Sequence, residues 1–122
     1  MTRATTMLFA AAALAAAVTV AGLSDAQAQD PAARGKKVYN ANCMACHGEK
    51  GDGKGPAAVA LNPKPTSFTA PEYWKGKTDE ALKTSIKAGK PGTPMAPFPQ
   101  LNDADVSALI VYLRAFGGDA AK

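Results

Sequence analysis

Cysteine and histidine are scarce in this sequence of 122 residues, which contains two cysteines and one histidine. Two cysteines permit at most one disulfide bond, so the chain is not a disulfide-rich scaffold. Aromatic residues make up 7% of the sequence, and a chain of this length builds one small core rather than the several cores of a multidomain enzyme. There is one long apolar run, near the N-terminus, which excludes a multi-span membrane protein. Domains with such thin cores often depend on a bound metal or cofactor.

The one long apolar run predicts an export signal. It extends from Met7 to Val20, follows the positive charge of Arg3, and precedes Ala26-Gln27-Ala28, where small residues occupy the two positions that signal peptidase reads. We therefore expect residues 1–28 to be a cleaved signal peptide and residues 29–122 to form an exported domain in the periplasm, without stable membrane insertion. An uncleaved membrane anchor is the alternative, because the run is at the short end of the range for a membrane-spanning helix.

Both cysteines and the histidine lie within five residues, in the sequence Cys43-Met44-Ala45-Cys46-His47. A disulfide between Cys43 and Cys46 would close a very short loop and stabilise the fold little. A thioredoxin-like redox pair expects a βαβ context, and the flanking sequence shows no strand pattern. A structural zinc site needs four ligands, which the chain cannot complete with cysteine and histidine. The fourth interpretation, which we favour, is covalent attachment of a c-type haem: Cys-x-x-Cys-His is its signature, and positions three and four apart share one face of a helical turn.

A haem iron bound by one histidine has a second axial position, and methionine is the side chain left to fill it. The chain has no second histidine, and the cysteines would be used in thioether links to the haem. Two of the four methionines lie in the predicted signal peptide and Met44 lies inside the attachment motif, which leaves Met95. Residues 92–99 around it are rich in proline and predict a stiff loop, although a methionine in the core is the alternative. Axial ligation by His47 and Met95 leaves no open position on the iron and indicates a carrier of single electrons.

The order of several short motifs resembles class I monohaem cytochrome c over residues 31–118. The matching residues are, in chain order, Gly35, Tyr39, Cys43-x-x-Cys46-His47-Gly48, Gly55-Pro56, Thr93-Pro94-Met95, Leu109 and Tyr112-Leu113. The resemblance implies an all-α class I cytochrome c fold, with three main helices and with loops wrapped around one covalently bound haem c. It also implies that the backbone carbonyl of Pro56 accepts a hydrogen bond from the iron-binding imidazole, which would fix the ring.

Capping residues and apolar periodicity predict three helices, covering Pro31 to Ala41, Thr78 to Ala88, and Asp103 to Phe116. By resemblance to class I cytochromes, the first and the last of these helices cross near Gly35. Glycine, proline and lysine dominate between His47 and Trp74, which predicts a loop without strands around the haem.

Three aromatic side chains are further candidates for the haem pocket. Trp74 either donates its indole N–H to a haem propionate or belongs to the core, with that N–H satisfied elsewhere. Phe68 and Phe98 are expected to pack on the haem, with packing elsewhere in the core as the alternative. Together with Pro56, they complete the predicted cofactor-binding residues.

The chain carries a formal net charge of +4, and its basic excess lies in residues 34–64. Such a surface would steer the protein toward acidic docking surfaces on other redox proteins, at a rate that falls as salt rises; an ordinary solvated surface is the alternative. Nucleic-acid binding is not expected, because the chain has no motif of basic and aromatic residues and an export signal precedes the domain.

These features predict a soluble periplasmic one-electron carrier rather than an enzyme. The alternative from another class is the haem c electron-transfer subunit of a larger periplasmic oxidoreductase complex, in which a partner chain performs the chemistry. Catalysis at the iron, as in a peroxidase, would need Met95 to dissociate readily, and the proline-rich loop around it argues against that.

Overall fold

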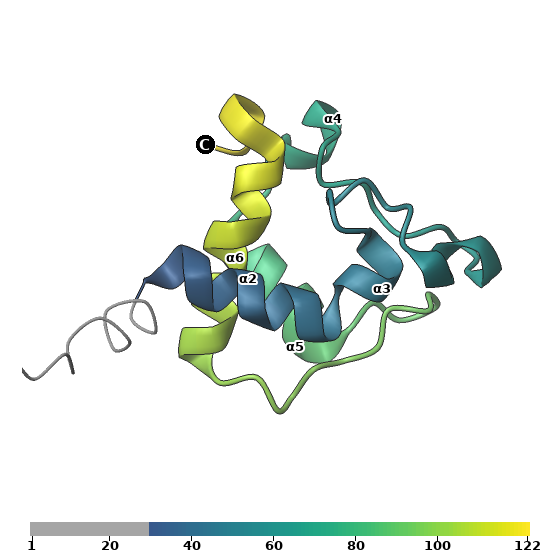
Figure 1. The fold of residues 1–122 in the computed structure, drawn as a ribbon, viewed down its shortest axis with the longest axis horizontal. Helices are drawn as coiled ribbons and strands as arrows, with labels where there is room; N and C mark the ends of the chain where they lie inside the picture. Colours follow the sequence, from purple (N-terminus) through teal and green to yellow (C-terminus); the bar gives the residue numbers. More distant parts are fainter. Residues whose placement is uncertain (1–29) are drawn as a thin grey trace, which may run out of the picture.

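The computed structural model describes residues 30–122, whose regular structure is helical (Figure 1). No β-strand occurs among these described residues, and the all-α fold predicted from the sequence is confirmed. The predicted signal peptide, residues 1–28, lies outside the described residues. None of the helices in the described part of the chain is long and apolar enough to cross a membrane.

Helices α2 (Pro31–Asn42) and α6 (Asp103–Gly117) pack against each other as the main pair (Figure 1). The Asp30 carboxylate accepts a hydrogen bond from the first turn of α2, and Asn102 begins α6 in a reciprocal capping box with Asp105. Such caps satisfy backbone N–H groups that have no partner inside the helix. Both helices match their predicted ranges to within one residue at each end. Gly35 of α2 lies against the backbone of α6, so the predicted crossing point is confirmed.

Helix α5 (Asp79–Ala88) is the third main helix and packs on α6. The Thr78 hydroxyl accepts a hydrogen bond from the backbone N–H of Ala81, and acidic residues occupy the first turn, where they complement the helix dipole. Leu82 and Ile86, one turn apart, are its buried residues. The predicted helix differs from the observed one by a single residue at its start.

Short helical turns interrupt the segment that the sequence predicts as loop. They are α3 (Met44–His47), the 3₁₀ helix η1 (Pro56–Ala60) and α4 (Pro71–Trp74), and a further 3₁₀ helix, η2 (Gly118–Ala121), follows α6. Proline starts both η1 and α4, which is the helical position where its missing N–H costs nothing. The loop between His47 and Trp74 is therefore more ordered than its composition predicts.

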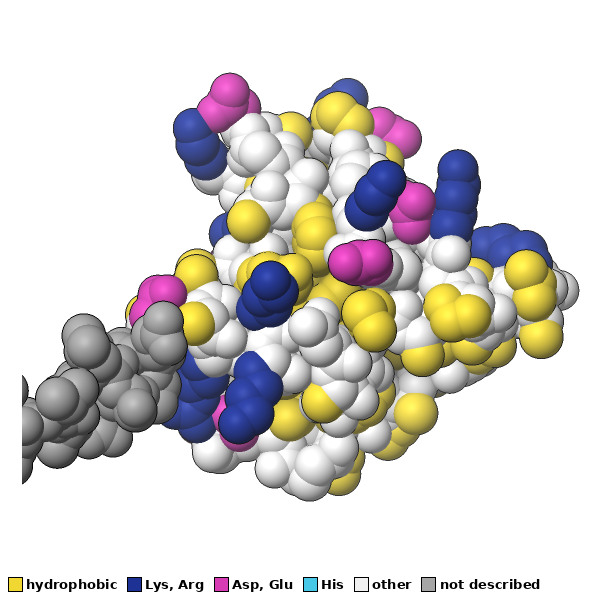
Figure 2. Space-filling model, in the orientation of Figure 1, with side chains coloured by type: hydrophobic (Ala, Val, Ile, Leu, Met, Phe, Trp, Pro, Cys, Tyr) yellow, Lys and Arg dark blue, Asp and Glu magenta, His cyan; other side chains and the backbone are white. Residues whose placement is uncertain are grey.

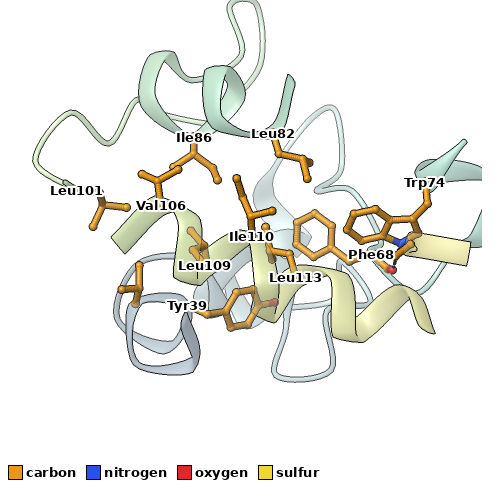
Figure 3. Close-up of a cluster of buried hydrophobic side chains, with 12 residues drawn as sticks. Tyr39, Phe68, Trp74, Leu82, Ile86, Leu101, Val106, Leu109, Ile110 and Leu113 are labelled. Atoms are coloured by element: carbon orange, nitrogen blue, oxygen red, sulfur yellow. Dashed lines mark hydrogen bonds between the residues drawn. The ribbon is translucent and has the colours of Figure 1, made fainter. Parts of the chain in front are cut away.

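The apolar core lies between α2, α5 and α6 and extends toward α4 (Figure 3). Aliphatic side chains from α5 and α6 fill one end of it, and Phe68 and Trp74 fill the other (Figure 3). Tyr39, Leu109 and Val106 are its most completely buried large side chains. The core thus holds the main helices together as a helical frame, and the segments that connect these helices are available to form a site.

Candidate functional site

Helix α3 places Cys43, Cys46 and His47 on one turn directly after α2. The carbonyl of Cys43 accepts hydrogen bonds from the backbone N–H groups of Cys46 (3.2 Å) and His47 (2.9 Å). Gly48 ends the turn with a φ of 84°, a conformation that favours glycine. The predicted helical turn is therefore present, and it gives the two thiols and the imidazole a common face.

These three side chains line a cavity of about 410 Å³. Its walls come from the end of α2 and α3, from residues 61–66, and from residues 90–98. The last of these segments contributes Met95 and Phe98, so the structure brings Met95 into one cavity with Cys43, Cys46 and His47. The predicted four donors converge although Met95 is far from the others in the sequence.

The His47 imidazole is held on its edge and on its face. Its Nδ1 atom lies 3.0 Å from the carbonyl oxygen of Thr66, which can only accept, so Nδ1 carries the proton. The ring of Phe68 stacks on the imidazole, with centroids 4.5 Å apart and planes 21° apart. Burial lowers the pKa of His47, while the Thr66 hydrogen bond opposes this and Lys90 adds to it. The side chain is therefore a neutral imidazole with a free Nε2 lone pair, the form that binds a metal.

The structure corrects the prediction for Pro56. Thr66, not Pro56, supplies the carbonyl that pairs with the His47 ring, and Pro56 is an exposed residue at the start of η1, outside the cavity wall. The preceding Gly55 is packed so tightly that an added Cβ would lie 2.3 Å from the carbonyl oxygen of Ala45. Any backbone carbonyl can accept such a bond, so no pattern in the sequence singles out Thr66.

The aromatic candidates divide between the cavity and the core. Phe98 lines the cavity, as predicted. Trp74 is buried and does not line the cavity. Its single indole N–H donates to the carbonyl of Phe68 at 2.7 Å. The propionate interpretation is therefore wrong, and the core alternative describes this structure. Phe68 is buried against His47, Trp74 and Phe116 instead of lining the cavity wall.

Both cysteine thiols are free and half-buried. Burial, with a smaller contribution from Cys46, raises the pKa of Cys43 to about 11, so this thiol is protonated at neutral pH. The structural disulfide between Cys43 and Cys46, one of the alternatives for this motif, is not formed in this structure.

Met95 lies in a loop whose residues form hydrogen bonds with one another. Its carbonyl accepts from the backbone N–H of Lys90 (3.1 Å), and its own N–H donates to the Thr93 hydroxyl (3.3 Å). The loop turns at Gly89, where φ is 70° and an added Cβ would lie 2.8 Å from the Met95 carbonyl oxygen. The Phe98 N–H then bonds the carbonyl of Ile86 in α5 at 3.0 Å. Proline and these hydrogen bonds give the thioether a defined position.

The charged residues in the cavity wall are both lysines, Lys64 and Lys90, and both are exposed. The Lys64 ammonium donates to the carbonyls of Ala58 and Val59 and so closes the end of η1. The Val59 side chain is 83% exposed. Hydrophobic side chains also gather toward the right-hand edge of the molecule in Figure 2. The cavity is thus bordered by positive charge, which would suit an apolar group that carries negative charge.

The donor set fits a c-type haem. Two thiols on one turn, a neutral imidazole and a methionine thioether are the groups through which such a haem is attached and its iron ligated. The apolar wall around them suits the porphyrin, and the lysines suit its carboxylates. Across residues 30–122, no cluster of three or more His, Cys, Asp or Glu side chains is placed to hold a free metal ion.

Comparison with known proteins agrees with this chemistry. The family model of cytochrome c matches residues 32–116. Curated relatives include the cbb3-type cytochrome c oxidase subunit CcoP of Azospirillum brasilense, 33% identical over 87 residues, which cover 71% of this chain and 29% of the relative. The FixP subunit of Azorhizobium caulinodans is 34% identical over 101 residues, covering 81% of this chain and 32% of the relative. The chain therefore spans about a third of the length of these relatives.

One solved structure also matches. A chain of the reducing HAO-like protein complex of Kuenenia stuttgartiensis superposes with a TM-score of 0.60 at 30% sequence identity. The match covers 68% of this chain and 41% of that chain. Both kinds of comparison thus align this chain with one part of a longer protein.

Proposed function

Because the chain belongs to the cytochrome c family, we propose that it carries single electrons between other redox proteins in the periplasm and is not itself an enzyme. Electron transfer is the role of a cytochrome c domain, and haem c with its iron, bound covalently, is the cofactor. The observation that supports a carrier is the convergence of Cys43, Cys46, His47 and Met95 on one cavity.

We assign a role to each of these four side chains. Cys43 and Cys46 would form the thioether links to the haem, and His47 and Met95 would be the axial ligands of its iron. The bound haem supplies a one-electron iron(III)/iron(II) couple. Phe98 would contribute to the apolar wall that keeps water away from it.

Contacts within the fold support the positions of both proposed ligands. The Thr66 carbonyl fixes the tautomer of His47, so that Nε2 is the atom free to bind, and raises the basicity of the ring. The hydrogen bonds around Met95 hold the sulfur in the cavity wall. If His47 and Met95 held the iron of a bound haem, no position would be left there for a substrate, which favours electron transfer over peroxidase chemistry.

Substitution of the two half-buried methionines tests the ligation. After maturation in the periplasm, M95L should lose the far-red iron–sulfur band of the oxidised spectrum, because leucine has no donor atom. The matched variant M44L should retain it, because Met44 packs against the hydrophobic core and is absent from the cavity wall. A band that survives in M95L would contradict the assignment of Met95.

A subunit of a larger oxidoreductase complex is the second candidate. The relatives named CcoP and FixP are oxidase subunits, and the structural match lies in a protein complex, which favours this candidate. Purification of the full chain under mild conditions, followed by mass measurement in solution, separates the two. A monomer supports the free carrier, whereas a stable association with a larger redox chain supports the subunit.

A further inference from the structure

We propose that Phe68 and Trp74, neither of which lines the cavity, form a support that fixes the His47 imidazole and thereby sets the reduction potential of the iron. The inference rests on the proposed function, in which His47 is an axial ligand. Phe68 and Trp74 act here as positioning residues, because they reach the iron only through His47.

One short segment holds the imidazole in two directions. The Thr66 carbonyl oxygen accepts a hydrogen bond from Nδ1–H of His47, with the two heavy atoms 3.0 Å apart, which fixes the edge of the ring. Phe68, two residues later, covers its face with ring planes 21° apart. Rotation of the imidazole about its Cβ–Cγ bond would break the hydrogen bond and the stacking together, so the two contacts restrict the same motion.

The segment of residues 66–68 is itself held by contacts with the residues that follow the attachment motif. The backbone N–H of Phe68 donates to the carbonyl of Gly51 at 2.6 Å. Gly53 lies so close that an added Cβ would be 2.5 Å from the carbonyl oxygen of Pro65. Gly53 in turn donates its N–H to the carbonyl of His47 at 2.8 Å. His47 and its support therefore share one set of backbone contacts.

Trp74 anchors the segment from the opposite side. Its indole N–H donates to the Phe68 carbonyl at 2.7 Å, the one hydrogen bond marked in Figure 3. The indole lies against Gly117 near the end of α6, where an added Cβ would be 2.2 Å from Nε1. The position of the indole thus depends on a glycine that touches neither His47 nor the cavity. This arrangement connects the helical frame to the imidazole.

The expected consequence concerns the strength of His47 as a ligand. A firm hydrogen bond to Nδ1 makes an imidazole more basic, and a more basic ligand stabilises iron(III). A loosened segment should therefore weaken the Thr66 bond and raise the reduction potential. It should also change the orientation of the ring, which the haem-methyl proton shifts of the oxidised protein report.

Three variants test the support by independent routes. F68L removes the stacked ring, and W74F removes the indole N–H. G117A keeps both aromatic residues in the sequence but shifts the indole, because the added methyl group would collide with it. Each should raise the potential and alter the haem-methyl shift pattern. V106A is the matched control, because Val106 is buried at the opposite end of the core (Figure 3). It should lower the thermal midpoint while keeping the potential and the shifts of the parent protein.

The outcomes separate this inference from the proposed function. Variants that lose stability as V106A does, with potential and shifts unchanged, would show a merely structural role and overturn the inference. If W74F fails to fold, G117A provides the test in its place, because alanine suits the backbone conformation of residue 117. A parent protein that binds no haem, or whose iron is not ligated by His47, would overturn the proposed function and this inference with it.

Discussion

A Cβ atom added at Gly35 would lie 2.1 Å from the carbonyl oxygen of Ala108, so helices α2 and α6 meet backbone to backbone. Glycine inside a helix costs about 1 kcal/mol relative to alanine. The close approach explains why glycine occurs at position 35 despite this cost, because no larger residue fits there without separating the helices.

The variant G35A should lower the free energy of unfolding by about 1–3 kcal/mol, because the two helices must separate to admit a methyl group. Without the contact, the same change in a helix would stabilise the protein. Guanidinium denaturation of the haem-loaded protein measures the difference. The exposed neighbour K36A is the control and should stay within about 0.5 kcal/mol of the parent; a more stable G35A would refute the contact.

Tyr39 stabilises the end of the attachment motif. Its buried hydroxyl donates to the carbonyl of Gly48 at 2.6 Å, and burial keeps the pKa of Tyr39 well above its ordinary value, so the donor stays protonated. Y39F should cost about 1 kcal/mol of unfolding free energy. Tyr112, whose ring packs 5.3 Å from that of Tyr39, makes no hydroxyl hydrogen bond within residues 30–122. Y112F should therefore be nearly neutral, and equal losses in both variants would argue against the Gly48 bond.

The ion pair of Arg34 with Asp105 should make stability depend on pH. The hydrogen bond from Arg34 lowers the pKa of Asp105 below its ordinary value of 3.8. A lowered folded-state pKa stabilises the protein at pH values above 3.8, and this contribution disappears as the pH falls through the folded-state pKa.

Thermal midpoints of the parent and of D105N should therefore differ at neutral pH and converge in acid. D103N is the control, because the Asp103 carboxylate is exposed and lies 3.8 Å from Lys83 in a looser pair. A difference between parent and D105N that is constant across the acid range would assign the effect to packing or capping rather than to charge.

Lys90 at the cavity wall should steer charged redox reagents. K90E should slow oxidation of the reduced protein by ferricyanide, an anion, and accelerate oxidation by the cationic tris(phenanthroline)cobalt(III). Stopped-flow rates at low ionic strength measure both. The opposite changes should vanish at 1 M salt, where the screening length is about 3 Å. K36E, with its charge on α2 outside the cavity wall, is the control; equal effects from both variants would mean that net charge alone matters.

The sequence predicted the helices well because local signals determine them. Capping side chains, apolar periodicity and terminal glycines mark the ends of α2, α5 and α6, and each lies within one residue of its predicted range. The convergence of the four side chains was also predictable, because the chain has two cysteines, one histidine and, outside the predicted signal peptide and the attachment motif, one methionine.

The support of His47 was not predictable in the same way. Thr66 acts through a backbone carbonyl, which every residue possesses, and the identity of the accepting residue depends on how the loop folds. Trp74 carries one N–H, and the sequence could not decide between a propionate and a protein carbonyl as its acceptor. Both choices depend on contacts between distant segments, such as the indole against Gly117.

The loop around Met95 has a consequence for how such proteins diverge. Within the described residues, the hydrogen bonds recorded for residues 90–96 stay inside that segment, and Phe98 connects it to α5. Because these bonds stay local, we expect that the segment can be lengthened, shortened or exchanged while the helices keep their register. A designer who transplants loops should therefore be able to replace Met95 and its surroundings without rebuilding the domain.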